Sequence, residues 1–543
     1  MTDSNDRLFF VLPHGAALTG ADAAAIGSKA LGLLRLARLG VRVPPAFVLG
    51  TAVCRDYYSA GGRLPDDVRP MLEVGLARLS EATGRQFGSS RRPLLLAVRS
   101  GAPVSMPGMM ETVLNVGLTD QTLGGFLRST GNPRLVRDCY RRLMRDFTLV
   151  VHGCAPAALD AIVEKACREQ GVASARELDT AGLASVCTQT LQTARALTGR
   201  PFPQSPLDQL EQAVEAVFRS WNSERARHYR RLNRIDDALG TAVTVQAMVF
   251  GNGDATSGAG VGFTRDPATG ENGLYLDFLF NAQGEDVVAG HHGVEDTARL
   301  SWQLPVVSQE LARMKAVLEG EFHDMQDFEF TVEQGKLYLL QTRAGKRTPW
   351  AAVRMAVDMV HEGLISPAEA LARLRPYELE RIERARLAPD VSVEPLTTAV
   401  PASTGVAQGI LAFDSKRAVE LAARGQGVIL ARHDIETADI EGIAAADGVL
   451  TAGGGRTSHA AVVARQLGKV CLVGCSDLAL DPGGRDCAIA GRHLNEGDTI
   501  TLDADAGRIY PGRLPLVREQ PERELAEIRR WQSKCVPGAQ ASP

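Results

Sequence analysis

The stretch DGVLTAGGGRTSHAAVVARQLGKVCLVGC at residues 447–475 decides the fold of its part of the chain. A short apolar strand comes first, three glycines and a Thr-Ser pair follow, and apolar residues then repeat at helical spacing. Thr457 or Ser458 is a good N-cap, so we expect a helix whose first turn contains His459. A second apolar strand closes the stretch and completes the strand, helix, strand alternation of an α/β domain.

The position of His459 favours phosphoryl chemistry. The free N–H groups and the positive dipole end at a helix N-terminus attract an anion and oppose protonation of the imidazole. A neutral imidazole is a nucleophile, and glycines let backbone approach a bulky charged group. We therefore expect His459 to act with its loop, which consists of Gly454, Gly455, Arg456, Thr457 and Ser458. The alternative is a glycine-rich turn before a histidine of no special role.

The stretch MQDFEFTVEQGKLYLLQTR at residues 325–343 predicts a hairpin. Strand alternation places Asp327 and Glu329 on one face of its first strand, and two carboxylates on one side of a strand can hold Mg²⁺. The return strand then carries Gln341 and Arg343 on a shared face near the carboxylates. The alternative is a half-exposed hairpin whose acids are solvated.

The stretch GNGDATSGAGVGFTRDP at residues 251–267 reads as a glycine-rich loop between strands. Successive backbone N–H groups in such loops cradle polyphosphate, so Ser257, Gly258 and Gly260 are candidate phosphate contacts. The pattern is weak, because hairpin turns also use glycine, and neither a dinucleotide fingerprint nor a P-loop motif accompanies it.

Two cations complete the candidate phosphate contacts. Lys29 follows Gly27-Ser28 inside a predicted helix over 24–40, and Arg99 ends the predicted strand LLLAVR. For a single lysine or arginine, a solvated surface position is the usual explanation. Their case depends on the other motifs.

Composition sets the outer limits. At roughly 150 residues a domain, 543 residues suggest about three to four domains. The 60 Lys and Arg residues and 64 Asp and Glu residues give a formal charge of -4, which predicts no nucleic-acid partner. The nine cysteines form no C-x-x-C pair, which argues against a disulfide framework and a zinc ribbon. We see no leader and no apolar membrane segment, and therefore expect a cytoplasmic protein without a membrane role.

Taken together, four segments resemble the pyruvate phosphate dikinase family, namely residues 97–118, 245–290, 325–348 and 449–469. The resemblance runs from near residue 8 to about 515 and implies an α/β and α+β multidomain fold. It implies the following order of domains: an ATP-grasp nucleotide-binding domain over 1–345 with a helical insert at about 124–233, a helical linker over 346–392, a swivelling α/β phosphohistidine domain over 393–515, and a helical tail over 516–543.

The resemblance also implies an activity and its residues. In the family, the β-phosphoryl of ATP passes to a histidine and the γ-phosphoryl to inorganic phosphate, which gives AMP and pyrophosphate with Mg²⁺ as cofactor. Transferred position by position, this implies Lys29, Arg99 and Arg343 as phosphate contacts and His459 as the phosphorylated residue. It further implies Asp327, Glu329 and Gln341 as metal and catalytic-site ligands.

Two features depart from the family. Arg456 stands where the family usually has Met, and with it GGRTSHAA resembles phosphoenolpyruvate synthase and enzyme I of the sugar phosphotransferase system. Gly453 stands where the family usually has Arg, so a cation that would stabilise or dock the phosphohistidine is missing from the loop. The segment at 97–118 nevertheless favours phosphate over water as the γ-phosphoryl acceptor. The family also continues into a barrel that binds pyruvate or phosphoenolpyruvate, for which 543 residues leave no room.

We therefore expect a partial dikinase that charges His459 and passes the phosphoryl group to pyruvate on a barrel protein supplied in trans. One alternative is a dikinase for an alcohol or phenol with its own partner subunit. Another is a catalytically idle ATP-binding regulatory module. Assembly into a homo-oligomer stays open.

Overall fold

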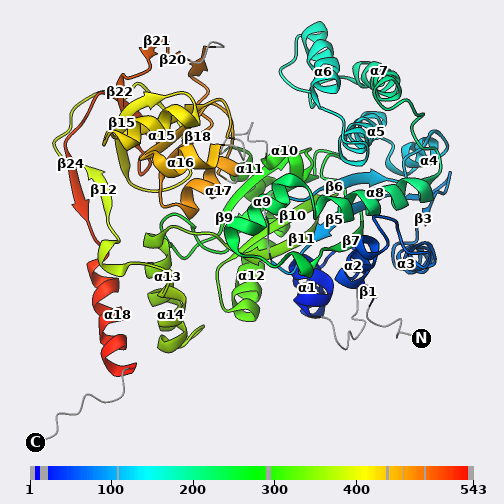
Figure 1. Ribbon diagram of the computed structural model, residues 1–543, viewed down its shortest axis with the longest axis horizontal. Helices are drawn as coiled ribbons and strands as arrows, with labels where there is room; N and C mark the ends of the chain where they lie inside the picture. The colour runs from blue at the N-terminus through cyan, green and yellow to red at the C-terminus, as the bar shows by residue number, and fades with distance from the viewer. Residues whose placement is uncertain are drawn as a thin grey trace, which may run out of the picture. The chain divides into compact units, whose positions relative to one another are not determined.

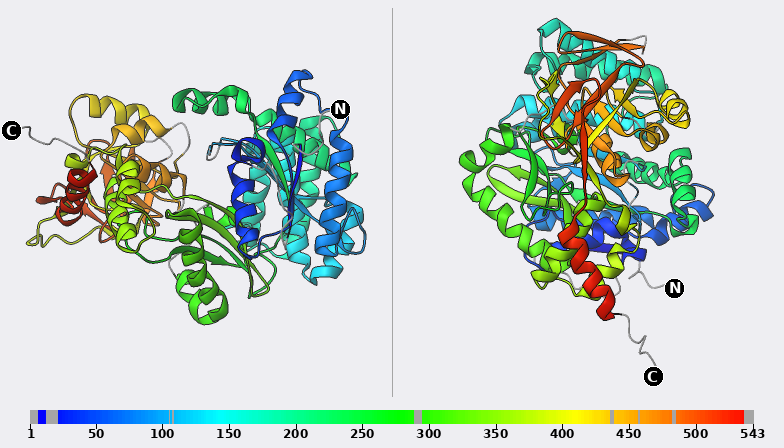
Figure 2. Two further views of the ribbon diagram at one scale, coloured as in Figure 1. Left: turned by 90° about the horizontal axis from the view of Figure 1, so that it is seen from below. Right: turned by 90° about the vertical axis from the view of Figure 1, so that its left-hand side faces the viewer.

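The computed structural model describes residues 7–12, 22–104, 106, 109–288, 295–435, 439–456, 458–481 and 485–535. The chain divides into two compact units. The first comprises Met1–Ser257 and Thr331–Arg343, and the second comprises Gly258–Phe330 and Ala344–Pro543. Figure 1 labels the elements, and Figure 2 shows the ribbon from two further sides.

The first unit is built on a five-stranded sheet with the order β1-β2-β7-β5-β6. Every neighbouring pair in it is antiparallel. The strands are β1 (Leu8–Val11), β2 (Ala46–Leu49), β7 (Ala242–Ala247), β5 (Leu96–Gly101) and β6 (Thr112–Val116). Helices α1 (Ala23–Arg38), α2 (Thr51–Ser59) and α3 (Val68–Thr83) pack against this sheet, and β3 (Gln86–Phe87) pairs with β4 (Pro93–Leu94) beside it.

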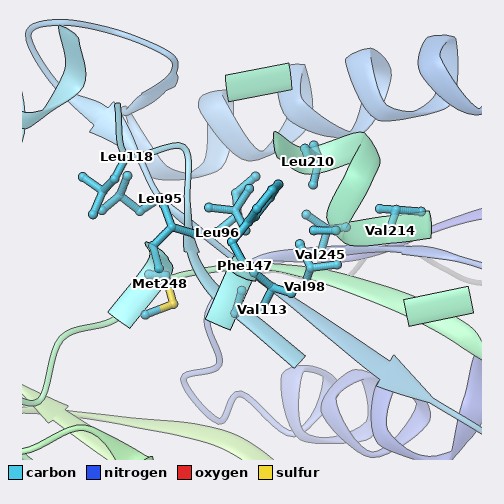
Figure 3. Close-up of a cluster of buried hydrophobic side chains, with 14 of the residues drawn as sticks. Leu95, Leu96, Val98, Val113, Leu118, Phe147, Leu210, Val214, Val245 and Met248 are labelled. Atoms are coloured by element: carbon cyan, nitrogen blue, oxygen red, sulfur yellow. The ribbon is translucent and has the colours of Figure 1, made fainter. Parts of the chain in front are cut away.

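The core of the first unit lies between this sheet and a group of helices. Figure 3 shows Val98 of β5 and Val245 of β7 near Phe147 and two side chains of α8, Leu210 and Val214. The helices between β6 and β7 are α4 (Asp120–Thr130), α5 (Pro133–Asp146), the π-helix Phe147–Val151, α6 (Ala157–Gln170), α7 (Thr180–Thr198), α8 (Pro206–Ser220) and α9 (Glu224–Asn233), followed by a short 3₁₀ turn (Asp237–Leu239).

The caps explain where several of these helices begin and end. The side chain of Asn132 accepts the N–H of Leu135 at the start of α5, and Asp179 accepts the N–H of Gly182 at the start of α7. Left-handed Gly131 and Gly199 end α4 and α7. These are the residue types that stop and start helices by local hydrogen bonding, so the helical character of this region follows from short-range sequence.

A four-stranded sheet with the order β11-β10-β8-β9 contains the predicted hairpin, and the division between the units runs through that hairpin. Its strands are β8 (Gly258–Phe263), β9 (Tyr275–Phe280), β10 (Gln326–Glu333) and β11 (Lys336–Ala344). Between β9 and β10 lie α10 (Gly284–Val288), α11 (Glu295–Gln303) and α12 (Pro305–Phe322). Arg265, two residues after β8, is buried and forms ion pairs with Glu319 of α12 and with Glu362, which ends the helix α13 (Pro349–His361).

The second unit ends in an α/β module on an eight-stranded sheet with the order β13-β23-β22-β15-β16-β17-β18-β14. Strands β15, β16, β17 and β18 are parallel. The strands are β13 (Thr397–Thr398), β14 (Val400–Pro401), β15 (Val406–Ala412), β16 (Val428–Arg432), β17 (Gly448–Thr451), β18 (Val470–Val473), β22 (Thr499–Asp503) and β23 (Arg508–Pro511). Helices α15 (Ser415–Ala423), α16 (Ile440–Ala445) and α17 (His459–Gln466) connect them, and β19 (Leu478–Leu480), β20 (Asp486–Ile489) and β21 (Arg492–Asn495) form a small separate sheet.

The segment between the two sheets differs from expectation at its end. Helices α13 (Pro349–His361) and α14 (Pro367–Leu374) form, and a 3₁₀ turn (Leu379–Arg381) follows. The expected helix does not continue, because β12 (Arg384–Leu387) pairs with β24 (Leu516–Glu519) in the expected helical tail. The paired strands lie more than 100 residues apart, so nothing local predicts them. Helix α18 (Glu522–Cys535) then packs on α13 and α14 through Leu525, Ile528 and Trp531 (Figure 1).

Two general features complete the fold. The eight cysteines whose side chains the structure describes are free thiols. Among the described residues, no helix has both the length and the apolar character needed to cross a membrane.

Candidate functional site

Lys29 lies just after a break in α1. Gly27 has a φ of 77°, so the helix proper begins after it. A Cβ at Gly27 would lie 1.9 Å from the carbonyl oxygen of Gly101, at the end of β5. The N–H and hydroxyl of Ser28 both donate to the carbonyl of Ala102, at 3.0 and 3.1 Å. This close approach holds the turn that bears Lys29 against the end of the strand that bears Arg99.

Arg99 links β5 to β7 and β11 within the first unit. Its Nη1 lies 3.5 Å from Oε1 of Gln246 and 3.4 Å from the carbonyl of Leu340, and its Nη2 lies 3.4 Å from Oε1 of Gln341. Gln341 is buried, and Arg343 follows on the same strand half-buried. The structure therefore brings together Arg99 and Gln341, two of the residues singled out from the sequence.

Helix α1 reaches the same strand. Three residues after Lys29, a Cβ at Gly32 would lie 3.2 Å from the carbonyl oxygen of Thr342, between Gln341 and Arg343. The elements that carry Lys29, Arg99 and the Gln341–Arg343 pair are thus packed against one another in the first unit.

The glycine-rich segment is a loop as far as Ser257, and the expected loop over 251–267 is wrong for Gly258–Phe263, which form a strand. Ser257 is fully buried, donates to Oδ1 of Asp254 at 2.8 Å and accepts the N–H of Gln334 at 2.9 Å. From Gly258 the chain is the buried strand β8, which has hydrogen-bonded neighbours on both sides.

The glycines of β8 leave space for aromatic rings. A Cβ at Gly258 would lie 2.2 Å from Phe278, one at Gly260 2.3 Å from Phe330, and one at Gly262 2.4 Å from Phe328. Close packing therefore explains these glycines without a ligand. A phosphate contact by Ser257, Gly258 or Gly260 stays a prediction.

The carboxylates of β10 lie on the opposite face from these rings. Because successive side chains of a strand alternate, Asp327 and Glu329 point away from Phe328 and Phe330. Asp327 is buried and Glu329 half-buried. Among the described residues, no group of three His, Cys, Asp or Glu side chains is placed to hold a metal ion. Two carboxylates fit Mg²⁺ that arrives with a nucleotide, because Mg²⁺ commonly takes its other ligands from phosphates and water.

The carboxylate face of this sheet also contacts the loop before His459 inside the second unit. By the same alternation, Phe263 of β8 shares the face of Asp327, and Phe263 pairs with Tyr275 of β9. The Cζ of Arg456 lies 4.9 Å from the Tyr275 ring centroid, and the Cζ of Arg465 lies 5.5 Å from that of Phe263. Burial raises the pKa of the Tyr275 hydroxyl, and the charges of Arg456 and Arg465 oppose this shift. Tyr275 is therefore neutral, and its ring contacts Arg456 by a cation–π interaction.

The loop before His459 is held by its own hydrogen bonds. The hydroxyl of Thr451 donates to the carbonyl of Gly453 at 2.6 Å, and the N–H of Ser458 donates to the carbonyl of Gly455 at 3.0 Å. Gly454 has a φ of 90°, a conformation that side chains disfavour. Buried Ser458 caps α17 by accepting the N–H of Ala461.

Helix α17 begins at His459, so the expected first-turn position is what the backbone shows. Thr457 and the side chain of His459 lie outside the described residues.

Comparison of the sequence with known proteins identifies the family of the chain. The family described as "Pyruvate phosphate dikinase, AMP/ATP-binding domain" matches residues 62–301 and 306–364, more than half of the chain. The chain belongs to the pyruvate phosphate dikinase family. A second description, "PEP-utilising enzyme, mobile domain", matches residues 424–507 and includes His459. The predicted α/β and α+β multidomain fold, with an ATP-grasp domain followed by a phosphohistidine domain, is thereby confirmed.

Curated members of the family are similar along nearly all of this chain. The pyruvate, phosphate dikinase of Clostridium symbiosum is 40% identical over 512 residues, which cover 94% of this chain and 59% of the relative. That of Rhizobium meliloti (strain 1021) is 40% identical over 518 residues, covering 93% and 58%. That of Giardia intestinalis is 42% identical over 516 residues, covering 94% and 58%. The chain spans a little under three fifths of the length of these relatives.

Sequence reasoning missed the residues that join the loop to the sheet. Phe263, Tyr275 and Arg465 were not singled out, although all three lie in or beside the family's motifs. One signal was available: an arginine directly after Ala464 interrupts a row of small apolar residues on α17. Such an arginine is either exposed or specifically held, and Arg465 is 1% exposed.

Proposed function

We propose that this chain carries out the nucleotide half-reaction of a pyruvate phosphate dikinase. ATP, inorganic phosphate and His459 give AMP, pyrophosphate and a phosphohistidine. The bond between the α- and β-phosphoryl groups breaks as a nitrogen of His459 takes the β-phosphorus, and the γ-phosphoryl passes to phosphate. The observation that carries this proposal is the contact of the His459 loop with the sheet face that bears Asp327 and Glu329.

The residues divide the work by charge. Lys29, Arg99 and Arg343 offset the negative charge of the phosphate chain, and Gln341 is positioned beside Arg99. Asp327 and Glu329 would hold Mg²⁺, which supplies charge neutralisation on the phosphoryl oxygens when it is bound. Phosphoryl transfer needs such positioning and electrostatic stabilisation more than covalent help from the protein.

We further propose pyruvate as the final acceptor, bound on a barrel outside these 543 residues and supplied in trans. Two observations support it: the curated relatives are named pyruvate, phosphate dikinases, and the second matching family is described as PEP-utilising. Inorganic phosphate as the γ-phosphoryl acceptor is supported by the segment at 97–118. An alcohol or phenol acceptor and an idle regulatory module are the alternatives that the experiments below distinguish.

The first experiment follows the β-phosphoryl group. The purified chain is incubated with β-labelled ATP, Mg²⁺ and phosphate, and we expect acid-labile label on the protein and pyrophosphate in solution. The His459→Ala variant is the control and takes up no label. Label that persists in this variant, or no label on the unsubstituted chain, contradicts the proposal. Undiminished labelling without phosphate, with release of free phosphate, contradicts phosphate as the acceptor.

The second experiment tests the acceptor. The charged chain is mixed with pyruvate and with the full-length Clostridium symbiosum relative, in which the histidine that corresponds to His459 has been replaced by alanine. We expect label to leave His459 and to appear in phosphoenolpyruvate. Label that stays on the protein with pyruvate but leaves it with an alcohol or phenol would favour the alternative acceptor.

A further inference from the structure

Arg465 is a buried arginine with more hydrogen-bond donors than partners. It is 1% exposed. Its Nη1 donates to the carbonyl of Arg456 at 2.7 Å and to that of Ala402 at 3.0 Å. Its Nε and Nη2 are buried without a hydrogen-bond partner. No carboxylate of the described residues lies within ion-pair distance of it.

Burial of such a side chain lowers the stability of the folded state. A buried charge without a counter-ion costs several kcal/mol, and buried donors are paired in the great majority of cases. An aliphatic residue would fill the same space without this penalty. The two nitrogens that lack partners form one edge of a planar guanidinium, the geometry that binds two oxygens of a phosphate at once.

The surroundings of Arg465 place it at the proposed transfer site. Its guanidinium lies over Phe263, on the face of the sheet that bears Asp327. Burial lowers the pKa of Arg465, and the charges of Asp327 and Asp266 are among those that oppose this shift. Arg465 therefore lies within electrostatic range of the predicted metal ligand Asp327 without an ion pair to it.

The same side chain is tied to the loop of the phosphorylated residue. Arg456, whose carbonyl it holds, lies three residues before His459, and Arg465 lies six residues after it on the same helix. Any movement of the phosphohistidine module therefore carries the histidine and this guanidinium together.

We propose that Arg465 is a catalytic residue that grips the phosphoryl group in transit: Nε and Nη2 donate to two non-bridging oxygens of the β-phosphoryl, while Nη1 keeps the His459 loop in place. This inference rests on the proposed function. It assigns the bound phosphate group to an edge of Arg465 that has no protein partner. Because a cation at a transferring phosphoryl group strengthens as charge develops, it acts mainly on the rate of transfer.

The test separates the phosphate contact from the anchoring of the loop. Arg465→Lys keeps a positive charge and donors for the loop carbonyls but removes the two-pronged edge. Two rates are measured on it: single-turnover charging of His459 by Mg-ATP, and modification of His459 by diethyl pyrocarbonate, which transfers no phosphoryl group. The signal from the His459→Ala variant is subtracted from both. Arg424→Lys, at an exposed arginine after α15, is the matched control.

We expect charging by ATP to fall about 10²- to 10³-fold in Arg465→Lys, the size seen when one donor to a developing oxyanion is removed. Modification of His459 by diethyl pyrocarbonate and the thermal midpoint stay close to those of the unsubstituted chain and of Arg424→Lys. A parallel fall of both rates would show a loop anchor only and overturn the proposal. Charging by ATP at the unsubstituted rate would overturn it as well.

A second measurement keeps this inference separate from the proposed function. Binding of inorganic pyrophosphate with Mg²⁺ is measured by calorimetry on the unsubstituted chain and on Arg465→Lys. We expect about tenfold weaker binding in the variant, even if the unsubstituted chain takes no label from ATP and the proposed function fails. Equal affinity of the two proteins would overturn the phosphate contact.

Discussion

At the scale of single residues, Gly27 shows how the lack of a side chain positions a charged neighbour. Its left-handed conformation and its approach to the carbonyl of Gly101 bring the Lys29 turn to the end of the Arg99 strand. Gly40, just beyond the other end of the same helix, is also left-handed, but nothing lies within 4 Å of a Cβ there. A substitution at Gly40 therefore introduces conformational strain alone, whereas one at Gly27 introduces the same strain and a steric clash.

We expect Gly27→Ala to lower the free energy of unfolding by about 3 kcal/mol and to weaken Mg-ATP binding. The cost combines about 1 kcal/mol for the left-handed conformation with the displacement of rigid backbone. Gly40→Ala should cost about 1 kcal/mol and leave Mg-ATP binding unchanged. Urea unfolding and calorimetric titration measure both quantities. Equal effects of the two substitutions would show that the contact with Gly101 is unimportant.

Asp138 is a second residue whose role depends on burial. Burial alone would raise its pKa, but Arg142 and Arg141 hold the pKa of this carboxyl far below its ordinary value. Its Oδ2 also accepts from the amide of Asn252, which ties α5 to the glycine-rich loop. Because the pKa is lowered on folding, the carboxylate stabilises the fold at neutral pH, and this contribution is lost progressively as the pH falls from the ordinary pKa of an aspartate to the lower folded pKa.

We expect Asp138→Asn to lower the free energy of unfolding at pH 7 by about 3 to 5 kcal/mol, because it removes the buried carboxylate that pairs with both Arg141 and Arg142. The difference from the unsubstituted chain should shrink as the pH falls below about 3.9, the ordinary pKa of an aspartate. Glu164→Gln, in an exposed pair with Arg168, is the control and should change stability by less than about 0.5 kcal/mol. Denaturant unfolding across the pH range measures both.

At the scale of elements, β8 shows that a glycine-rich stretch need not be a loop. Gly258, Gly260 and Gly262 alternate with larger residues, so all three face one layer of phenylalanine rings. Phe278 and Phe330 stack across this layer with ring centroids 5.8 Å apart. The packing leaves no room for side chains on that face of β8. Phe263 lies on the opposite face, which is also the face of Asp327 and Glu329.

We expect Gly260→Ala to lower the free energy of unfolding by about 2 to 3 kcal/mol, because its Cβ would meet both Phe330 and the carbonyl of Asp277. Gly273→Ala, in the turn that leads to β9, meets no atom within 4 Å and is the matched control. Thermal unfolding of both variants measures the difference. A similar midpoint for the two would contradict the packing account.

At the scale of the whole molecule, the candidate residues divide between the two units. The first unit contains Lys29, Arg99 and Gln341, whereas the second contains the carboxylates of β10 and His459. The proposed metal ligands lie on β10, whereas the histidine lies at the start of α17. Loss of the metal should therefore stop transfer without changing the histidine itself.

We therefore expect removal of Mg²⁺ with EDTA to abolish charging of His459 by ATP and to leave its modification by diethyl pyrocarbonate unchanged. With Mg²⁺ and phosphate but without pyruvate, the label on the protein should saturate at about one phosphoryl group per chain, with one AMP formed for each. Asp327→Asn should behave like the chelated protein at low Mg²⁺. Rapid-quench labelling measures these quantities, and label well above one per chain would contradict a single phosphohistidine.

Much of the fold and part of the site could be predicted from local sequence. The start of α17 at His459 depends on Ser458 and its neighbours, and the alternation along β10 depends on residues two positions apart. Caps and strand alternation act over a few residues, so they are readable without the fold. The β12 and β24 pair and the strand character of β8 were not predictable in this way, because their partners lie elsewhere in the chain.

By itself, the sequence determined the kinds of chemistry present: a histidine at a helix start, paired carboxylates, and cations after glycines. Only the tertiary structure decided that Arg465 faces Phe263, that Gly27 meets Gly101, and that the glycines of β8 lie under phenylalanine rings. Each of these contacts joins residues far apart in the chain. Whether a charge is buried or a side chain fits depends on what lies across that contact, and no window of neighbouring residues contains that information.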